Sequence, residues 1–271
     1  GLEEFKLDVT GDAISQNINI SDIPSGTYAL SVRMTDKNGL EATAKSDIFY
    51  IRNSMPTTDV SLITDLTYRD KPLISSEDYK LKIDVSEDFK NADNTENQNL
   101  YYRVSNTVDT YGEWIKAGAV NKTDTGLTAS IESDSPIIAL ADGENTFYVQ
   151  TAICADNIDT AKININTVQT SEFTFFFDET PPQTRAVIND EHISESIKGK
   201  VYLTDNIDSD LKLVSNSSDV EVSNSEEDNV FDITVNKNVD TTLTAIDLAG
   251  NKTDIPLVID GIDTDAPTAN I

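Results

Sequence analysis

The chain has 271 residues, which is long enough for two or three domains that each bury a core of their own. Its 48 acidic and 20 basic residues give a net charge of −28, which argues against nucleic acids and anionic membranes as partners, because both bind basic patches. One cysteine excludes an intrachain disulfide, one histidine excludes a zinc site with two histidine ligands, and no apolar run reaches the ~18–20 residues of a membrane span, so we expect no direct membrane insertion.

The first 54 residues predict a pair of strands. Alternation of apolar and polar residues predicts a strand over Tyr28–Met34, and a return strand is expected over Glu41–Lys45, continuing to Ile48–Ile51. Between them, Asn38-Gly39 is a hairpin signal because both residue types accept positive φ at low cost. About 50 residues are few for a β-sandwich of ordinary size. We therefore interpret residues 1–54 as a partial or small β module.

Residues 55–178, the second module, predict a β-sandwich with a long acidic loop. The clearest alternating strand is Tyr79–Val85, and the polar stretch Ser86–Asn99 is interpreted as the solvated acidic loop. Phe173–Phe177 is interpreted as the final strand and a plug against the next module; the alternative is an edge strand open to another chain. Further strands are predicted at Asp59–Ile63, Leu100–Val104, Glu113–Lys116, Thr128–Glu132, Ile137–Leu140 and Thr146–Ile153.

Residues 179–262, the third module, predict another sandwich, which the hairpin Thr241–Asp260 closes around the turn Asp247–Asn251. No segment of the chain shows a convincing 3.6-residue apolar period, so we expect almost no helix. Residues 263–271 are interpreted as a linker and the start of a further repeat in a longer array. The other strands of the third module are predicted at Arg185–Ile188, Gly199–Leu203, Leu211–Val214, Val220–Val222 and Val230–Val235.

Three segments share one order of elements, which indicates an internal repeat. They begin at Tyr28, Thr146 and Thr241, and each runs as an alternating strand, an Asp/Asn turn, a second alternating strand and a proline-bearing linker. Strand pairs that pass to the next strand across a short linker are typical of tandem β-sandwiches. We therefore predict an all-β chain of tandem sandwiches in an extended array.

The closing hairpin and the linker after it resemble a known family. Asp247-x-x-Gly250-Asn251, followed by Asp263-x-Asp265-Ala-Pro267-Thr, is similar to the end and junction of tandem bacterial immunoglobulin-like (Big-type) repeats. Val201–Asp208 resembles the strand and Asp-Asn turn in the middle of such repeats. The resemblance covers the third module, part of the second and the final hairpin of the first. It implies immunoglobulin-like sandwiches in an extracellular setting, either in adhesins or in accessory regions of extracellular enzymes.

Acidic turns and linkers around the third module are candidate calcium ligands. Ca2+ takes 6–8 oxygen ligands, and loops rich in Asp and Asn supply them without helices. Such ions would stiffen the array. The alternative is that these side chains only bond the backbone of their own turns, and the sequence leaves both interpretations open. The candidates are Asp205, Asp208, Asp247 and Asn251 in the turns, and Asp178, Asp263 and Asp265 in the linkers.

Four aromatic residues of the second module are candidate ligand-binding residues: Trp114, Tyr101, Tyr102 and Tyr111. Flat aromatic rings stack on sugars, while nearby carboxylates accept hydroxyl protons. The alternative for Trp114 is packing in the sandwich core, where a lone tryptophan is common. For the neighbouring pair Tyr101 and Tyr102, strand alternation predicts one inward and one exposed ring.

These observations predict a non-catalytic stalk or adhesion scaffold segment of a secreted or cell-surface bacterial protein, stiffened by calcium where the metal binds. The expected partners are a host or environmental surface protein or glycan, and the neighbouring modules of the same chain. The alternative is a carbohydrate-binding accessory region of an extracellular polysaccharide-degrading system. Enzymatic activity is not expected, because a chain this acidic offers carboxylate pairs by chance and no motif organises them.

Overall fold

The computed structural model describes residues 19–20, 22–23, 26–51, 54–88, 98–124, 126–133, 138–155, 159–163, 168–189, 195–207, 210–263 and 268–269. These residues form mainly antiparallel sheets joined by turns, with one short 3-10 helix, η1 (Thr160–Lys162). The prediction of an all-β chain built from sandwiches is confirmed. Within the described ranges, no helix has the length and apolar character needed to cross a membrane.

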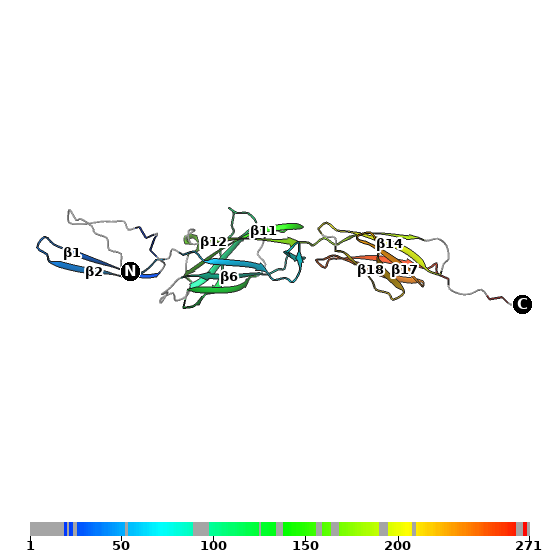
Figure 1. The fold of residues 1–271 in the computed structure, drawn as a ribbon, viewed down its shortest axis with the longest axis horizontal. Helices are drawn as coiled ribbons and strands as arrows, with labels where there is room; N and C mark the ends of the chain where they lie inside the picture. Colours follow the sequence, from blue (N-terminus) through cyan, green and yellow to red (C-terminus); the bar gives the residue numbers. More distant parts are fainter. Residues whose placement is uncertain are drawn as a thin grey trace.

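The first body is a single hairpin of two long strands, β1 (Gly26–Thr35) and β2 (Glu41–Ile51), at one end of the molecule (Figure 1). Its turn is built on Asp36, whose Oδ1 accepts from the backbone N of Asn38 and Leu40 at 2.8 Å each. Leu30, Val32 and Met34 share one face because alternate strand residues point the same way. They are 45%, 43% and 58% exposed, so in the described chain no second sheet covers this face.

The second module consists of two facing sheets. The smaller sheet has the order β3 (Thr57–Leu62), β6 (Leu81–Glu87), β10 (Leu127–Ser133) and β9 (Asn121–Lys122). The larger sheet has the order β4 (Thr67–Tyr68), β5 (Lys71–Ile74), β12 (Gln169–Phe177), β11 (Gly143–Ala155), β7 (Gln98–Ser105) and β8 (Ile115–Ala119). β5 joins β12 in parallel, and the other neighbouring strands of this sheet pair antiparallel.

Alternating apolar residues of both sheets fill the core of the second module. Leu81, Ile83 and Val85 point inward from β6, and they are 0–3% exposed. On the facing sheet, Phe147 and Phe175 lie on neighbouring strands, and their rings meet edge to face with centroids 4.9 Å apart. Burying such a ring is among the largest apolar contributions a small core offers.

The third module is a thinner sandwich. One sheet has the order β13 (Gln183–Asn189), β14 (Ile197–Thr204), β17 (Val230–Val235) and β16 (Val220–Asn224), and the other has the order β15 (Lys212–Ser215), β18 (Val239–Ile246) and β19 (Lys252–Ile259). Val201 and Ile233 of the first sheet pack with Leu243 and Leu257 of the second, and all four are at most 3% exposed. Figure 1 shows this module beyond the second one along the long axis.

Most predicted strands are found, with ends that shift by a few residues. The short strands β4, β5 and β9 were not predicted, because two to four residues carry no periodic pattern. For Phe173–Phe177, the alternative of an open edge strand is wrong where β12 ends, because β11 pairs along one side and β5 pairs with Phe176 and Phe177 on the other. Residues 138–140 of the predicted strand Ile137–Leu140 form no strand, and residue 137 lies outside the described part.

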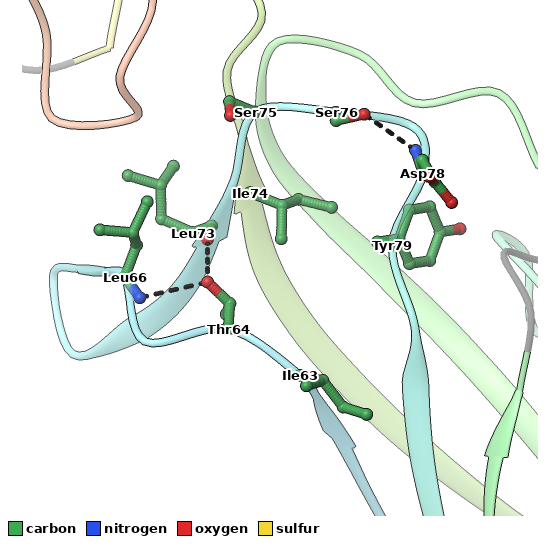
Figure 2. Close-up of a pocket in the computed structure, with 9 residues that line it drawn as sticks. All are labelled: Ile63, Thr64, Leu66, Leu73, Ile74, Ser75, Ser76, Asp78 and Tyr79. Carbon is green, nitrogen blue, oxygen red and sulfur yellow. Dashed lines mark hydrogen bonds between the residues drawn. The ribbon is translucent and has the colours of Figure 1, made fainter.

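A small open pocket of about 190 Å³ lies beside β5 in the second module. Figure 2 shows that the hydroxyl of Thr64 joins two of the lining residues: it accepts from Leu66 N and donates to the carbonyl oxygen of Leu73. Among its lining residues, Asp78 is the one carboxylate. A volume below the roughly 300–1,000 Å³ of small-molecule sites makes this pocket a packing irregularity.

Gly199 of β14 lies where the backbone of β13 comes too close to leave room for a side chain. A Cβ there would lie 2.9 Å from Val187 O and 3.3 Å from Ile188 Cα, both backbone atoms of β13. We expect Gly199→Ala to lower the unfolding free energy of the third module by roughly 1–3 kcal/mol, because the strands must move apart. Scanning calorimetry measures this loss. The control Gly261→Ala adds its Cβ into open space, and an equal loss in both variants would contradict the close strand approach.

Candidate metal centre

The second and third modules meet through a buried apolar contact. Tyr68 of β4 meets the ring of Phe176 edge on, with centroids 4.9 Å apart, and its hydroxyl donates to the carbonyl oxygen of Ile207 at 2.7 Å. A second bond joins Thr253 Oγ1 to the carbonyl oxygen of Pro182 at 2.6 Å. Tyr68 therefore bonds the second module to the third, and Thr253 bonds the third module to the linker. The cluster at this contact consists of Leu73, Phe176 and Ala249, with Tyr68, Ile207 and Leu248 packed against it.

The turn Asp247–Asn251 between β18 and β19 faces this contact. Gly250 adopts φ +92°, a conformation that favours glycine, and its N–H donates to the carbonyl oxygen of Asp247 at 3.3 Å. Asn251 donates to both carboxylate oxygens of Asp247, from its backbone N at 2.7 Å and from Nδ2 at 2.9 Å. Nδ2 also donates to the carbonyl oxygen of Asp178 at 2.9 Å, so the turn is bound to the linker.

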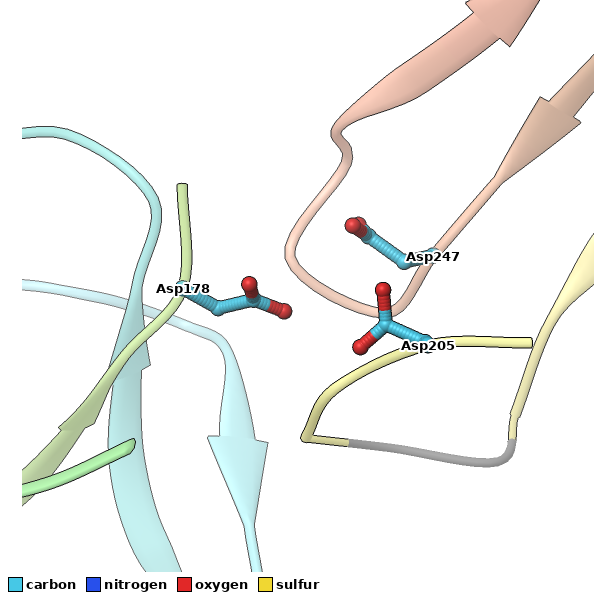
Figure 3. A group of neighbouring side chains, drawn as sticks. All are labelled: Asp178, Asp205 and Asp247. Carbon is cyan, nitrogen blue, oxygen red and sulfur yellow. The ribbon is translucent and has the colours of Figure 1, made fainter. Parts of the chain in front are cut away.

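Asp178 is placed at the junction because it directly follows β12. Its backbone N donates to Ile74 O at 2.9 Å, which extends the parallel pairing of β12 with β5. The side chain is 0% exposed, and Oδ1 accepts from Thr180 N at 3.2 Å. Oδ2 is buried and accepts no hydrogen bond from the described residues. Figure 3 shows this carboxylate directed across the junction toward Asp205 and Asp247.

Three carboxylates from three different segments converge at this point. Asp178 comes from the linker, Asp205 from the turn after β14, and Asp247 from the closing turn. One oxygen of each lies within 4.8 Å of the other two. Asp247 is 5% exposed and Asp205 is half-buried, with its Oδ1 accepting from Ile207 N at 2.9 Å. Backbone bonds thus fix each carboxylate before any ligand arrives.

Burial and like charge act together on Asp178. Burial of the carboxyl is the largest cause, and the negative charge of Asp205 is the next. Together with the charges of Asp247 and Asp142, these effects raise the pKa of Asp178 to about 7, while the hydrogen bond from the Thr180 N–H lowers it in part. A buried carboxylate that faces two others is costly unless a cation or a proton neutralises it. The junction therefore favours a positively charged ligand.

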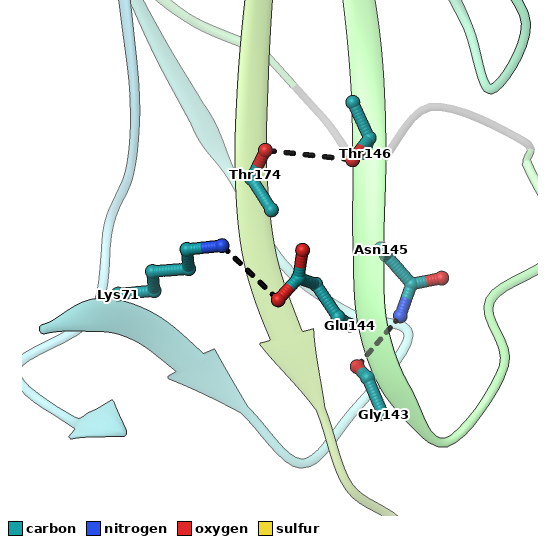
Figure 4. Close-up of polar contacts among 6 residues, drawn as sticks. All are labelled: Lys71, Gly143, Glu144, Asn145, Thr146 and Thr174. Carbon is teal, nitrogen blue, oxygen red and sulfur yellow. Dashed lines mark hydrogen bonds and ion pairs between the residues drawn. The ribbon is translucent and has the colours of Figure 1, made fainter. Parts of the chain in front are cut away.

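Asp142 supports the linker from the second module. Its Oδ1 accepts from Glu179 N at 3.0 Å, and its Oδ2 accepts from the hydroxyl of Thr180. The loop that carries it is fixed by Asn145, whose Nδ2 donates to the carbonyl oxygens of Ala141 and Gly143, as Figure 4 shows for Gly143. Figure 4 also shows Glu144 paired with Lys71 at 3.0 Å, which ties this end of β11 to β5.

The chemistry of the donor set fits a hard divalent cation. Carboxylate oxygens are preferred by Ca2+, Mg2+ and Mn2+, whereas zinc and copper sites commonly use imidazole or thiolate ligands. The three oxygens lie within 4.8 Å of one another, which is close enough for one ion of this class to contact all three.

The structure brings together three of the seven predicted metal ligands. Asn251 instead acts as a donor that supports Asp247 and the linker. Asp263 follows β19, so the length of that strand separates it from the Asp247–Asn251 turn and places it at the far end of the third module. Asp208 and Asp265 lie outside the described residues. Asp142, which supports the linker, was not among the predicted residues, because Asp142-Gly143 is a hairpin signal that carries no information about the junction.

The four candidate aromatic residues divide into two groups. Tyr101 and Tyr102 are 3% and 5% exposed, so the expectation that one ring is exposed is wrong: the outer face of β7 is covered as well as the inner one. Trp114 is not a core residue, since it is half-buried and stacks on Arg103 at 4.5 Å. Tyr111 stacks on the same guanidinium at 4.9 Å.

A scan against protein-family models finds no match to the chain, and a search among curated proteins finds none either. The site is therefore interpreted from its geometry and chemistry.

The raised pKa of Asp178 predicts a pH-dependent stability in metal-free buffer. In the folded chain this pKa is about 7, above the ordinary 3.8, so between these values the folded state holds a proton that the unfolded state has lost. Stability relative to Asp178→Asn should therefore fall as the pH rises from about 4 to about 7, then stay level. Thermal melts of both chains with EGTA measure this difference, and a constant difference across the window would contradict the assignment.

Proposed function

We propose that the chain is a non-catalytic stalk or adhesion scaffold segment in which Ca2+ at Asp178, Asp205 and Asp247 stiffens the junction of the second and third modules. The observation that carries the proposal is Asp178: it is 0% exposed, and its buried Oδ2 faces two more carboxylates without a hydrogen-bond donor in the described chain. A divalent cation would balance this charge and bind both modules at once. Removing it would restore repulsion across the contact.

The arrangement of ligands supports a role in the junction. Asp178 belongs to the linker, whereas Asp205 and Asp247 belong to the third module, so binding of a cation fixes the linker onto that module. The apolar cluster and the bonds of Tyr68 and Thr253 lie around the same contact. Extracellular modules bind Ca2+ with Kd values of about 10⁻⁴–10⁻³ M, which suits the millimolar calcium outside cells.

The wider assignment rests on the repeat and the family resemblance. We infer immunoglobulin-like modules at residues 55–178 and 179–262, a partial one at 1–54, and a linker at 263–271 that leads into a further repeat. The setting that this implies is a secreted or cell-surface bacterial protein. Its partners would be a host or environmental surface protein or glycan, and the neighbouring modules of the same chain.

Calcium should raise the melting temperature of the third module. At 10 mM Ca2+, which is about 10–100 times a Kd of 10⁻³–10⁻⁴ M, binding adds about 1.4–2.7 kcal/mol of stability, and for a domain of this size this corresponds to a rise of roughly 6–20 °C. Scanning calorimetry at pH 8 with 10 mM Ca2+ or with EGTA measures this. Magnesium should give a smaller rise, because it demands a tighter octahedral geometry.

Calcium should reverse the order of the melting temperatures of the wild-type chain and Asp178→Asn. Without calcium at pH 8, Asp178→Asn should melt above the wild-type chain, because a buried charge is removed. With calcium it should melt below the wild type and show no calcium-dependent rise. Asp240→Asn, at an exposed position of β18, is the matched control and should respond as the wild type does. A calcium-dependent rise that survives in Asp178→Asn would refute this metal centre.

A further inference from the structure

A second polar cluster lies on the outer face of the larger sheet of the second module. Arg103 of β7 stands opposite Gln150 of β11, and its Nε donates to Gln150 Oε1 at 2.8 Å. Gln150 Nε2 in turn donates to Thr170 Oγ1 of β12 at 3.1 Å. Gln150 is 8% exposed, so the guanidinium of Arg103 is bonded to a buried side chain that is itself bonded to the third strand. We call the three side chains Arg103, Gln150 and Thr170 the polar row.

The connection from β7 to β8 folds back over the polar row. Its first turn is anchored by Ser105, whose hydroxyl accepts from Thr107 N at 3.0 Å and donates to the carbonyl oxygen of Thr110. The rings of Tyr111 and Trp114 then lie against the guanidinium of Arg103, at 4.9 and 4.5 Å from its central carbon. Two cation–π contacts and one hydrogen bond therefore fix the plane of Arg103 in advance of any ligand.

The charge of Arg103 is not neutralised by an ion pair within the described residues. Lys71, Lys82, Lys200 and Lys237 pair with carboxylates, and the guanidinium of Arg103 does not. Burial lowers the pKa of Arg103, against smaller opposing effects of Tyr111 and Glu113. Its two terminal amino groups make no hydrogen bond to the described part of the chain. A partly dehydrated guanidinium of this kind gains strongly from a carboxylate that accepts both donors.

The surroundings of Arg103 favour a ligand that also has an apolar face. Val108 lies in the same connection as Trp114, and Ile115 follows Trp114 as the first residue of β8; their exposed fractions are 55% and 45%. Aromatic rings beside an arginine form a surface on which the C–H face of a sugar can stack while its polar groups bond the arginine. The net charge of −28 does not prevent this, because charges farther away than about 8 Å are largely screened at physiological ionic strength.

We propose that Arg103, Tyr111 and Trp114 form a binding site for a carboxylated glycan. The sugar carboxylate would bond the terminal amino groups of Arg103, and the sugar ring would stack beside Trp114. This site is separate from the metal centre and gives the scaffold a ligand-binding face of its own. Because it shares no residue with the Asp178 centre, failure of either proposal leaves the other standing.

The chain offers a direct reporter, because Trp114 is its one tryptophan. Its fluorescence is followed during titration with two carboxylated probes, tetragalacturonate and sialyllactose, each beside its neutral counterpart, the methyl-esterified tetramer and lactose. EGTA is present throughout, so that calcium cannot bridge protein and probe. At least one carboxylated probe should saturate with a Kd of about 1 mM or lower, and its neutral counterpart should bind at least tenfold more weakly.

Substitution of Arg103 separates binding from folding. Arg103→Lys keeps the charge but removes the planar pair of donors, so affinity for the carboxylated probe should fall at least tenfold. Arg185→Lys is the matched control, since Arg185 stacks on Tyr202 in the third module at 4.3 Å and should leave binding unchanged. Asp178→Asn should also bind normally. The proposal is overturned if neither probe changes the fluorescence, if neutral and carboxylated probes bind equally, or if Arg103→Lys with an unchanged melting temperature binds as the wild type does.

Discussion

The junction of the second and third modules depends on the repulsion among three carboxylates in a nearly dry contact. Asp178 is placed there by the pairing of β12 with β5, and Asp205 and Asp247 are placed there by two turns of the next module. The apolar cluster around Phe176 draws the modules together and dehydrates the same acids. Attraction and repulsion therefore act at one place, and the charge bound between the acids decides how firmly the modules are joined.

The remaining charge of the chain is accommodated differently. Lys71, Lys82, Lys200 and Lys237 form ion pairs that are at least one-third exposed, and such pairs contribute little to stability. Three described arginines, Arg69, Arg103 and Arg185, instead lie against aromatic rings. The strongly acidic balance is thus tolerated on solvated faces, and within the described residues it becomes a constraint where Asp178, Asp205 and Asp247 converge.

Strand alternation was sufficient to predict the class of fold, because thin sandwiches bury one face of each strand, as Leu81, Ile83 and Val85 of β6 do. It also marked Asp178, Asp205 and Asp247 as candidates, since all three follow strands. It could not select them from the seven candidates, because the selection depends on which strand ends meet across the junction. Alternation failed to predict the burial of Tyr101, because it carries no information about a segment that covers the outer face of a sheet. It also failed to place Trp114, whose ring packs against the guanidinium of Arg103 outside the core.

The distance distribution between the two modules tests the account most directly. In a Cys154→Ser background, spin labels at Glu132→Cys of β10 and Ser223→Cys of β16 occupy exposed positions on the second and third modules. Double electron–electron resonance at pH 8 should give one narrow distance with calcium and a broader distribution with EGTA. Distributions of equal width in both conditions would show that the carboxylates do not control the junction, and would contradict the account.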